Sequence, residues 1–255
     1  MTSEHDPPSR VSAALVAGGR FHDIDFARLE LLKLMVEHPH VRVSVHSDYE
    51  ATDAIVGSDL LVSYTCDVRP STDAQDAIAS WVEAGGRWIA LHGTNAALDL
   101  GAAGVSTPRC FPTWAETLGS QFIAHPPIAP YTVAAVSDHW LVDGIEPFET
   151  DDELYLCDYH DRESFDVHLA TNWTGTAAGF DESDWTDGDG QRLVQYVRPL
   201  GDGAVLYNTL GHCRSHWDMA PMTDYYPRIE RCSWEAPQYY ELLRRALRWG
   251  LGMDA

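Results

Sequence analysis

The chain has 255 residues, 45% of them hydrophobic, and its 39 acidic and 17 basic residues give a formal net charge of −22. So acidic a chain repels phosphate backbones and anionic lipid surfaces, which argues against nucleic acid and membrane partners. No apolar run approaches the roughly 18 residues of a membrane-spanning helix. The first ten residues also lack the basic flank and apolar centre of a signal peptide. We therefore expect a cytoplasmic protein.

The length is compatible with one large domain or two small ones. Residues 1–10 are polar, contain a Pro-Pro pair and are predicted to form a disordered tail. Residues 11–255 contain neither a linker nor an internal repeat. We therefore predict that they form a single domain.

In the first half of the chain, apolar runs typical of buried strands alternate with stretches of helical periodicity. The expected elements are strand 11–19, helix 26–37, strand 41–46, strand 59–65, helix 71–84 and strand 87–93. This alternation predicts an α/β fold with a parallel sheet that is covered on both faces.

The second half is less regular. An acidic, turn-rich insert at 181–190 does not have the spacing of a calcium loop and is interpreted as solvated. The stretch 212–234 is long, aromatic and irregular, as functional lids often are. The expected elements are helix 111–119, strands 131–136, 152–156, 167–171, 192–197 and 203–211, and helix 237–249.

Histidines follow several of the expected strands. Ligands of an open parallel sheet bind beyond the carboxyl ends of its strands, and His22 with Asp23, His92 and His212 all lie there. His125 precedes a rigid Pro-Pro pair. Each histidine alone is typical of a hydrogen-bonded turn. Together they predict a shared pocket, because histidine is the commonest metal ligand and transfers protons near neutral pH.

Glycines and one glutamate lie close to these histidines in the sequence. Gly18 and Gly19 end the first strand, and Gly93 follows His92. Glycine lets backbone N–H groups approach an anion closely, but a simple tight turn explains such a pair equally well. Glu153 lies among apolar residues. It is either a buried acid–base group or metal ligand, or a surface residue of an edge strand.

Several kinds of catalytic and binding site are not expected from this sequence. The segment 87–93 runs from a strand into a turn, and that turn carries His92 where a nucleophile elbow would present Ser or Cys. The five cysteines form no CxxC pair, so a zinc ribbon and a disulfide framework are not expected. The chain has no GxxxxGK[ST] loop, and we expect no nucleotide cofactor. Trp217 belongs to an aromatic region that either packs under a loop or stacks on a sugar ring.

Five segments in order, GGRFHD, AGGRWIALHG, GSQFIAHPP, DELY and GAVLYNTLGH, resemble the ThuA-like (trehalose utilisation) family of the class I glutamine-amidotransferase-like superfamily. The resemblance extends over residues 11–251. It implies a flavodoxin-like α/β fold, a three-layer sandwich with a mainly parallel central sheet. It also implies a role in disaccharide or oxidised-sugar metabolism without the amidotransferase cysteine. The matching positions are Gly18, Gly19, His22, Asp23, His92, Gly93, His125, Glu153, Gly211 and His212.

Our leading hypothesis is an enzyme that acts on a sugar or keto-sugar as a hydrolase, isomerase or lyase, with or without a divalent metal ion such as zinc. The alternatives are a non-catalytic sugar-binding or regulatory module and a degenerate amidotransferase subunit. A homodimer is a further expectation. The expected roles are catalysis by His22, Asp23, His92 and Glu153, substrate binding by Gly18, Gly19, Gly93 and Trp217, and metal binding by His22, His92, His125 and His212.

Overall fold

The computed structural model describes residues 10–101, 104–220 and 228–253. Nearly all of the predicted tail, residues 1–9, therefore lies outside the described residues, as does part of the irregular stretch at 221–227. The division into a tail and one domain stays a prediction. Within the described ranges, no helix is both long and apolar enough to cross a membrane.

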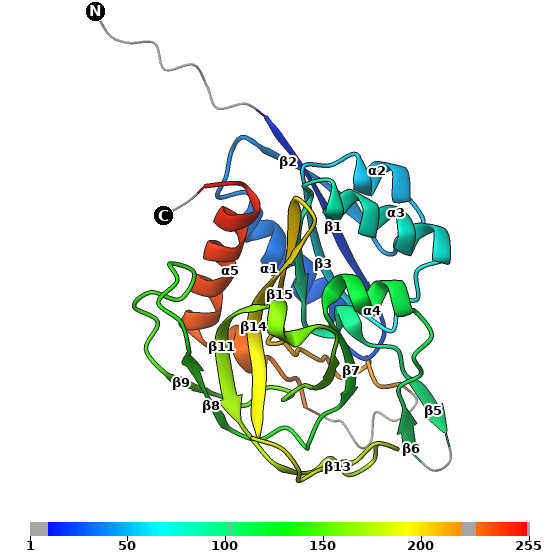
Figure 1. The fold of residues 1–255 in the computed structure, drawn as a ribbon, viewed down its shortest axis with the longest axis vertical. Coiled ribbons are helices and arrows are strands. Elements are labelled where there is room, and N and C mark those ends of the chain that lie inside the picture. The colour runs from blue at the N-terminus through cyan, green and yellow to red at the C-terminus, as the bar shows by residue number, and fades with distance from the viewer. Residues whose placement is uncertain (1–9, 102–103, 221–227, 254–255) are drawn as a thin grey trace, which may run out of the picture.

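The centre of the fold is a nine-stranded sheet with the order β2-β1-β3-β4-β15-β14-β11-β8-β9 (Figure 1). Its first five strands pair in parallel, and the remaining pairs are antiparallel. The strands of this sheet are β1 (Val11–Gly19), β2 (Val41–His46), β3 (Leu60–Cys66), β4 (Arg87–Leu91), β8 (Tyr131–Ala135), β9 (Phe148–Thr150), β11 (Asp166–Asn172), β14 (Gln191–Leu200) and β15 (Gly203–Asn208).

The sheet is therefore mixed, which corrects the expectation of a mainly parallel one. The reason lies in the connections of the second half. β14 and β15 are joined by two residues, Gly201 and Asp202, with Leu200 opposite Gly203. A link this short can join only antiparallel strands, whereas parallel neighbours need a crossover of a dozen or more residues.

Helices cover both faces of the parallel strands (Figure 1). Along β1, Leu15 belongs to the core under α1 and α5, while Val16 belongs to the core under α2, α3 and α4. Burial on both faces explains why β1, β3 and β4 contain continuous apolar runs, whereas the edge strand β2 alternates apolar and polar residues. The helices are α1 (Ile24–Met35), α2 (Thr52–Val56), α3 (Thr72–Glu83), α4 (Pro112–Leu118) and α5 (Pro237–Gly250).

The helix starts follow local sequence signals. The side chain of Asp23 accepts a hydrogen bond from the backbone N–H of Phe26 at 3.1 Å and caps α1. Ser71 caps α3 in the same way, since its side chain accepts from the backbone N–H of Ala74. α4 and α5 both begin with proline, whose missing N–H costs nothing in the first turn.

Smaller elements surround the carboxyl edge of the parallel strands. The segment 152–156, predicted as a strand, has no regular secondary structure until Leu156, where β10 begins. The helix α2 and the strand β7 have no counterpart among the predicted elements. The small strand pairs are β7 (Ser120–Ala124) with β10 (Leu156–Tyr159), β5 (Asp99–Gly101) with β6 (Gly104–Ser106), and β12 (Gly175–Thr176) with β13 (Asp184–Trp185).

Candidate active site

Four buried side chains from four distant segments meet beyond the parallel strands. His22 follows β1, His92 begins the 3-10 turn after β4, and His212 follows β15. Glu153 lies in the segment before β10. One ligand atom from each of the four lies within 4.8 Å of all the others. The parallel strands thus place the three histidines together because their carboxyl ends share one edge of the sheet.

The distances between these groups are short. Nε2 of His22 lies 2.8 Å from Nε2 of His92 and 3.1 Å from Nδ1 of His212. The Glu153 carboxylate lies 3.2 Å from His212 Nδ1, 3.4 Å from His92 Nε2 and 3.8 Å from His22 Nε2. The four groups therefore surround one small, water-poor space.

The outer nitrogen of each imidazole faces an oxygen atom. His92 Nδ1 lies 2.8 Å from the carbonyl of Thr209, and His22 Nδ1 lies 3.2 Å from the carbonyl of Arg20. His212 Nε2 lies 3.0 Å from a carboxylate oxygen of Glu230. Since these oxygens can only accept, each outer nitrogen carries the N–H. Such outer hydrogen bonds fix the tautomer of metal-binding histidines.

With their outer nitrogens protonated, the inner nitrogens of neutral His22 and His92 meet lone pair to lone pair. In the neutral tautomers, no hydrogen lies between Nε2 of His22 and Nε2 of His92, although they are 2.8 Å apart. Burial lowers the pKa of His22 to about 3, against the attraction of Glu153, so this ring stays neutral at physiological pH. Two buried acceptors at this distance repel each other unless a cation lies between them.

Carboxylates give the centre a charge that suits a cation. Burial opposes the ionisation of Glu153, but His125, His212 and His22 hold its pKa well below the usual carboxyl range. Burial likewise opposes a charge on His212, yet Glu153 and Glu230 raise the pKa of His212 to about 9. Without a metal, His212 thus carries a proton on both ring nitrogens, and its Nδ1 can donate to His22 or Glu153. This proton does not bridge the contact between His22 and His92.

Asp152 joins the segments that carry these groups. Its buried carboxylate accepts hydrogen bonds from the backbone N–H groups of Gly211 at 2.9 Å and His212 at 3.1 Å. It also accepts from the N–H of Glu153 at 2.7 Å and of Ser233 at 3.2 Å. The Asp152 side chain therefore fixes the backbone of His212 and Glu153, and also that of Ser233, which follows Glu230 in the chain.

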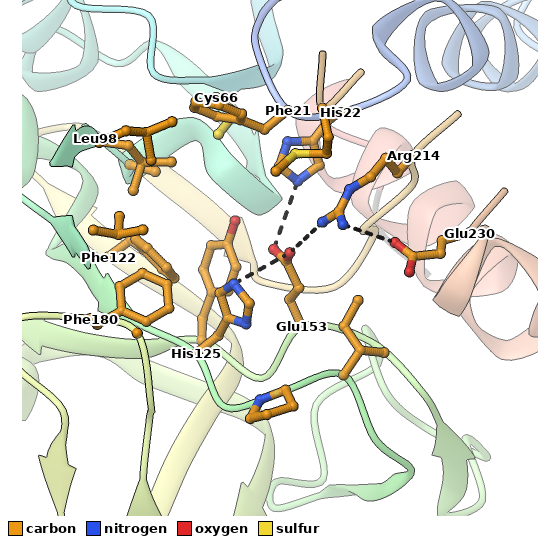
Figure 2. Close-up of a pocket in the computed structure, with 18 of the residues that line it drawn as sticks. Phe21, His22, Cys66, Leu98, Phe122, His125, Glu153, Phe180, Arg214 and Glu230 are labelled. Carbon is orange, nitrogen blue, oxygen red and sulfur yellow. Dashed lines mark hydrogen bonds and ion pairs between the residues drawn. The ribbon is translucent and has the colours of Figure 1, made fainter. Parts of the chain in front are cut away.

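A cavity of about 550 Å³ opens from this centre (Figure 2). His22 and Glu153 form part of its wall, beside Arg214 and Glu230. Arg214 lies 3.3 Å from Glu153 and 3.4 Å from Glu230. The size is typical of small-molecule sites. The arrangement places three buried imidazoles, two carboxylates and a guanidinium at the end of one pocket.

A sequence profile described as trehalose utilisation matches residues 13–226. The chain belongs to the ThuA family. No curated protein matches the sequence.

Solved structures share the fold of this ThuA-family protein. A ThuA-like protein from Bacteroides uniformis has 14% sequence identity and a TM-score of 0.66, with 100% of this chain and 96% of that chain covered. One from Parabacteroides merdae has 12% identity and a TM-score of 0.61, with 97% and 92% covered. A β-galactosidase from Rahnella sp. R3 has 13% identity and a TM-score of 0.58. It covers 96% of this chain, but this chain covers 32% of it.

Of the histidines expected to bind a metal, His125 lies apart from the other three in this ThuA-family protein. It is outside the group of four, while Glu153, expected to be catalytic, is inside it. His125 lines the pocket with 23% of its side chain exposed, and its Nε2 lies 3.5 Å from Glu153. Its place is therefore that of a pocket-facing group beside the centre.

The three glycines expected to bind substrate lie at the strand ends, where they pack against neighbouring backbone. A Cβ on Gly18 would lie 1.8 Å from the carbonyl oxygen of Ser47, and one on Gly19 would lie 1.9 Å from that of Cys66. A Cβ on Gly93 would lie 2.7 Å from the carbonyl oxygen of Thr65 and 2.8 Å from the Cβ of Cys66. None of the three lines the pocket. The glycines permit close backbone packing at the strand ends, which also accounts for their signal in the sequence.

Two further predicted residues point elsewhere. Asp23 caps α1 and forms an ion pair with Arg231 at 3.0 Å, and it is not part of the pocket wall. Trp217 is 72% exposed and also lies outside the wall. Their expected roles in catalysis and substrate binding stay predictions without support from the pocket geometry.

Sequence reasoning missed several polar groups of the site. Arg214 lies two residues after His212, and Tyr155 lies two after Glu153, so a period-two pattern could have found them. Tyr155 places its hydroxyl 3.2 Å from Nε2 of His92. Glu230 has no such signal. It reaches the site because its backbone pairs with Arg214 in an isolated β-bridge.

Proposed function

We propose that this ThuA-family protein is an enzyme of sugar metabolism in which His22, His92, His212 and Glu153 hold a divalent metal ion such as zinc. The main support is the position of the three imidazole rings. Nε2 of His22 lies 2.8 Å from Nε2 of His92 and 3.1 Å from Nδ1 of His212, while the opposite nitrogen of each ring faces an oxygen atom. The donor set fits, because zinc takes imidazole nitrogen and carboxylate oxygen. When bound, the ion would act as a Lewis acid on a carbonyl or hydroxyl oxygen of the substrate.

The surrounding residues supply the proton transfers of this proposal. Nδ1 of His125 lies 2.7 Å from the carbonyl of Pro126, so the N–H is there and Nε2 faces Glu153 and the pocket. His125 would therefore accept a proton from the substrate as a general base and return it as a general acid. Arg214 would bind an oxygen atom of the substrate in the same part of the cavity.

The sugar part of the proposal rests on the family, which is described as trehalose utilisation. A carbonyl next to a C–H bond suits this constellation, since a base beside a Lewis acid can remove a proton from that carbon. We therefore propose a hydrolase, isomerase or lyase that acts on a keto-sugar. The order β2-β1-β3-β4-β15 of the parallel strands also supports a flavodoxin-like core extended by antiparallel strands.

Metal analysis tests the centre. Protein purified without chelators is analysed by inductively coupled plasma mass spectrometry, beside the variants His92→Ala, His212→Ala and His125→Ala. We expect about one divalent ion per chain in the wild type and in His125→Ala, and loss of the ion in the other two. Metal-free protein from every preparation, including after zinc is added back, would contradict the metal centre.

Turnover tests the enzymatic part. Trehalose, glucosides and their 3-keto forms are incubated with metal-loaded protein, and products are followed by mass spectrometry. We expect turnover of a keto form, with kcat reduced about 10²-fold or more in His125→Ala. If a keto-sugar binds tightly and no metal supports its turnover, the chain is instead the sugar-binding module.

A further inference from the structure

The pocket has two chemically different ends (Figure 2). Figure 2 shows Glu153, Arg214 and Glu230 on one side, and Leu98, Phe122 and Phe180 on the other. The polar side chains of the wall that Figure 2 labels on the first side or beside it are His22, His125, Glu153, Arg214 and Glu230. A ligand that fills the cavity therefore meets charged groups at one end and hydrocarbon at the other.

The apolar end is built from rings in mutual contact. The ring centroids of Phe122 and Tyr155 are 4.4 Å apart, and those of Phe122 and Phe180 are 5.8 Å apart in an edge-to-face arrangement. His125 joins the two ends, since its ring lies 5.0 Å from that of Phe180 and its Nε2 lies 3.5 Å from Glu153. Aromatic side chains in a pocket wall can make the same offset or edge-to-face contacts with the aromatic ring of a ligand.

Backbone groups at this end are already paired within the protein. The N–H of Leu98 donates to the carboxylate of Asp67 at 3.0 Å, and its carbonyl accepts from Arg69 at 2.9 Å. The carbonyl of Gly179 accepts from the N–H of Val105 at 2.8 Å. A sugar hydroxyl buried here would lose its water partners without finding these groups free, at a cost of about 1–3 kcal/mol per group.

We propose that the pocket takes a glycoside with an aromatic aglycone, whose sugar lies at the polar end and whose aryl ring lies among Leu98, Phe122 and Phe180. This inference rests on the proposed function for the sugar half of the ligand. The assignment of the aryl half is supported only by the apolar residues of the pocket wall. A second sugar ring in the same place would bring several hydroxyls that the described wall cannot satisfy.

Binding of matched ligands tests the aryl subsite. Phenyl β-glucoside and methyl β-glucoside share the sugar and differ in the aglycone, and phenol represents the aryl group alone. Their dissociation constants are measured by calorimetry with the metal-loaded full chain. We expect phenyl glucoside to bind at least about tenfold more tightly than methyl glucoside, because one ring's apolar surface leaves water.

Variants locate the effect. In Phe180→Ala and in Leu98→Ala, the advantage of phenyl over methyl glucoside should fall to less than about threefold, with methyl glucoside affinity unchanged. Leu29→Ala removes an exposed apolar side chain of α1 and serves as the matched control, with the full advantage retained. Equal affinities of the two glucosides for the wild type, or an advantage that survives in both pocket variants, would overturn the proposal.

The same experiment separates this inference from the proposed function. If neither glucoside binds but phenol binds and Phe180→Ala abolishes its binding, the aryl subsite stands and the sugar assignment fails. If methyl glucoside and trehalose bind at least as well as phenyl glucoside, the sugar assignment stands and the aryl subsite is refuted.

Discussion

Removing the Asp152 carboxylate should destabilise the fold and weaken metal binding at the proposed centre. In Asp152→Ala, the backbone N–H groups of Gly211, His212 and Ser233 lose their acceptor in a place where Asp152 itself is 1% exposed. Each unpaired buried donor costs about 1–3 kcal/mol. Water that enters the vacated space would recover part of this. We therefore expect a loss of about 3–4 kcal/mol, a large share of the roughly 5–15 kcal/mol typical of a domain.

Urea unfolding followed by the fluorescence of the nine tryptophans measures this loss. Asp152→Asn keeps one acceptor oxygen and should lie between wild type and Asp152→Ala. Asp151→Ala removes the same charge from the exposed neighbouring residue and should change stability by less than about 0.5 kcal/mol. Zinc affinity should fall in Asp152→Ala and recover in part in Asp152→Asn. A loss below about 1 kcal/mol with unchanged zinc affinity in Asp152→Ala would refute the assigned role.

Three further predictions concern other contacts. Glu230→Gln should weaken zinc binding by about 10–100-fold, because it weakens the acceptor for the Nε2–H group of His212. An unchanged affinity in a zinc competition assay would contradict this. Gly18→Ala should lower the free energy of unfolding by about 1–3 kcal/mol, because the new Cβ would lie 1.8 Å from the carbonyl oxygen of Ser47. An unchanged midpoint of urea unfolding would contradict this. Burial lowers the pKa of His168 to about 4 from an ordinary 6.5, so its share of stability is complete above pH 6.5 and is lost as the pH falls to 4. His168→Gln should therefore flatten the decline in the free energy of unfolding between pH 7 and 5, and an equal slope would count against a buried neutral imidazole.

The elements that the sequence predicts well are those with a clear local pattern of apolar residues. β1, β2 and β3 and the helices α1 and α3 lie within two residues of their predicted bounds. Continuous apolar runs and helix caps are local signals, and local reasoning recovers them. The antiparallel half depends on hairpin pairing and register, which apolar runs alone do not specify. For that reason the mixed character of the sheet did not emerge from the sequence.

The site follows the same division. Histidines at strand ends could be predicted because a parallel sheet brings all carboxyl ends to one edge. The hydrogen-bond partners of these imidazoles could not be predicted. Thr209 and Arg20 contribute their backbone carbonyl oxygens, which every residue has, so the residue type gives no indication of this role. Glu230 reaches the centre through a β-bridge whose partners the sequence does not mark.

The metal centre is the claim on which the proposed function depends, and cobalt titration tests it most directly. Co²⁺ is added to chelator-treated protein, and the visible absorption that reports its ligands is followed to saturation. The proposal predicts one cobalt ion per chain, with an absorption band that is lost in His22→Ala and in His92→Ala and retained in His125→Ala. A band that survives in the first two variants, or wild-type protein that takes up no cobalt, would contradict it.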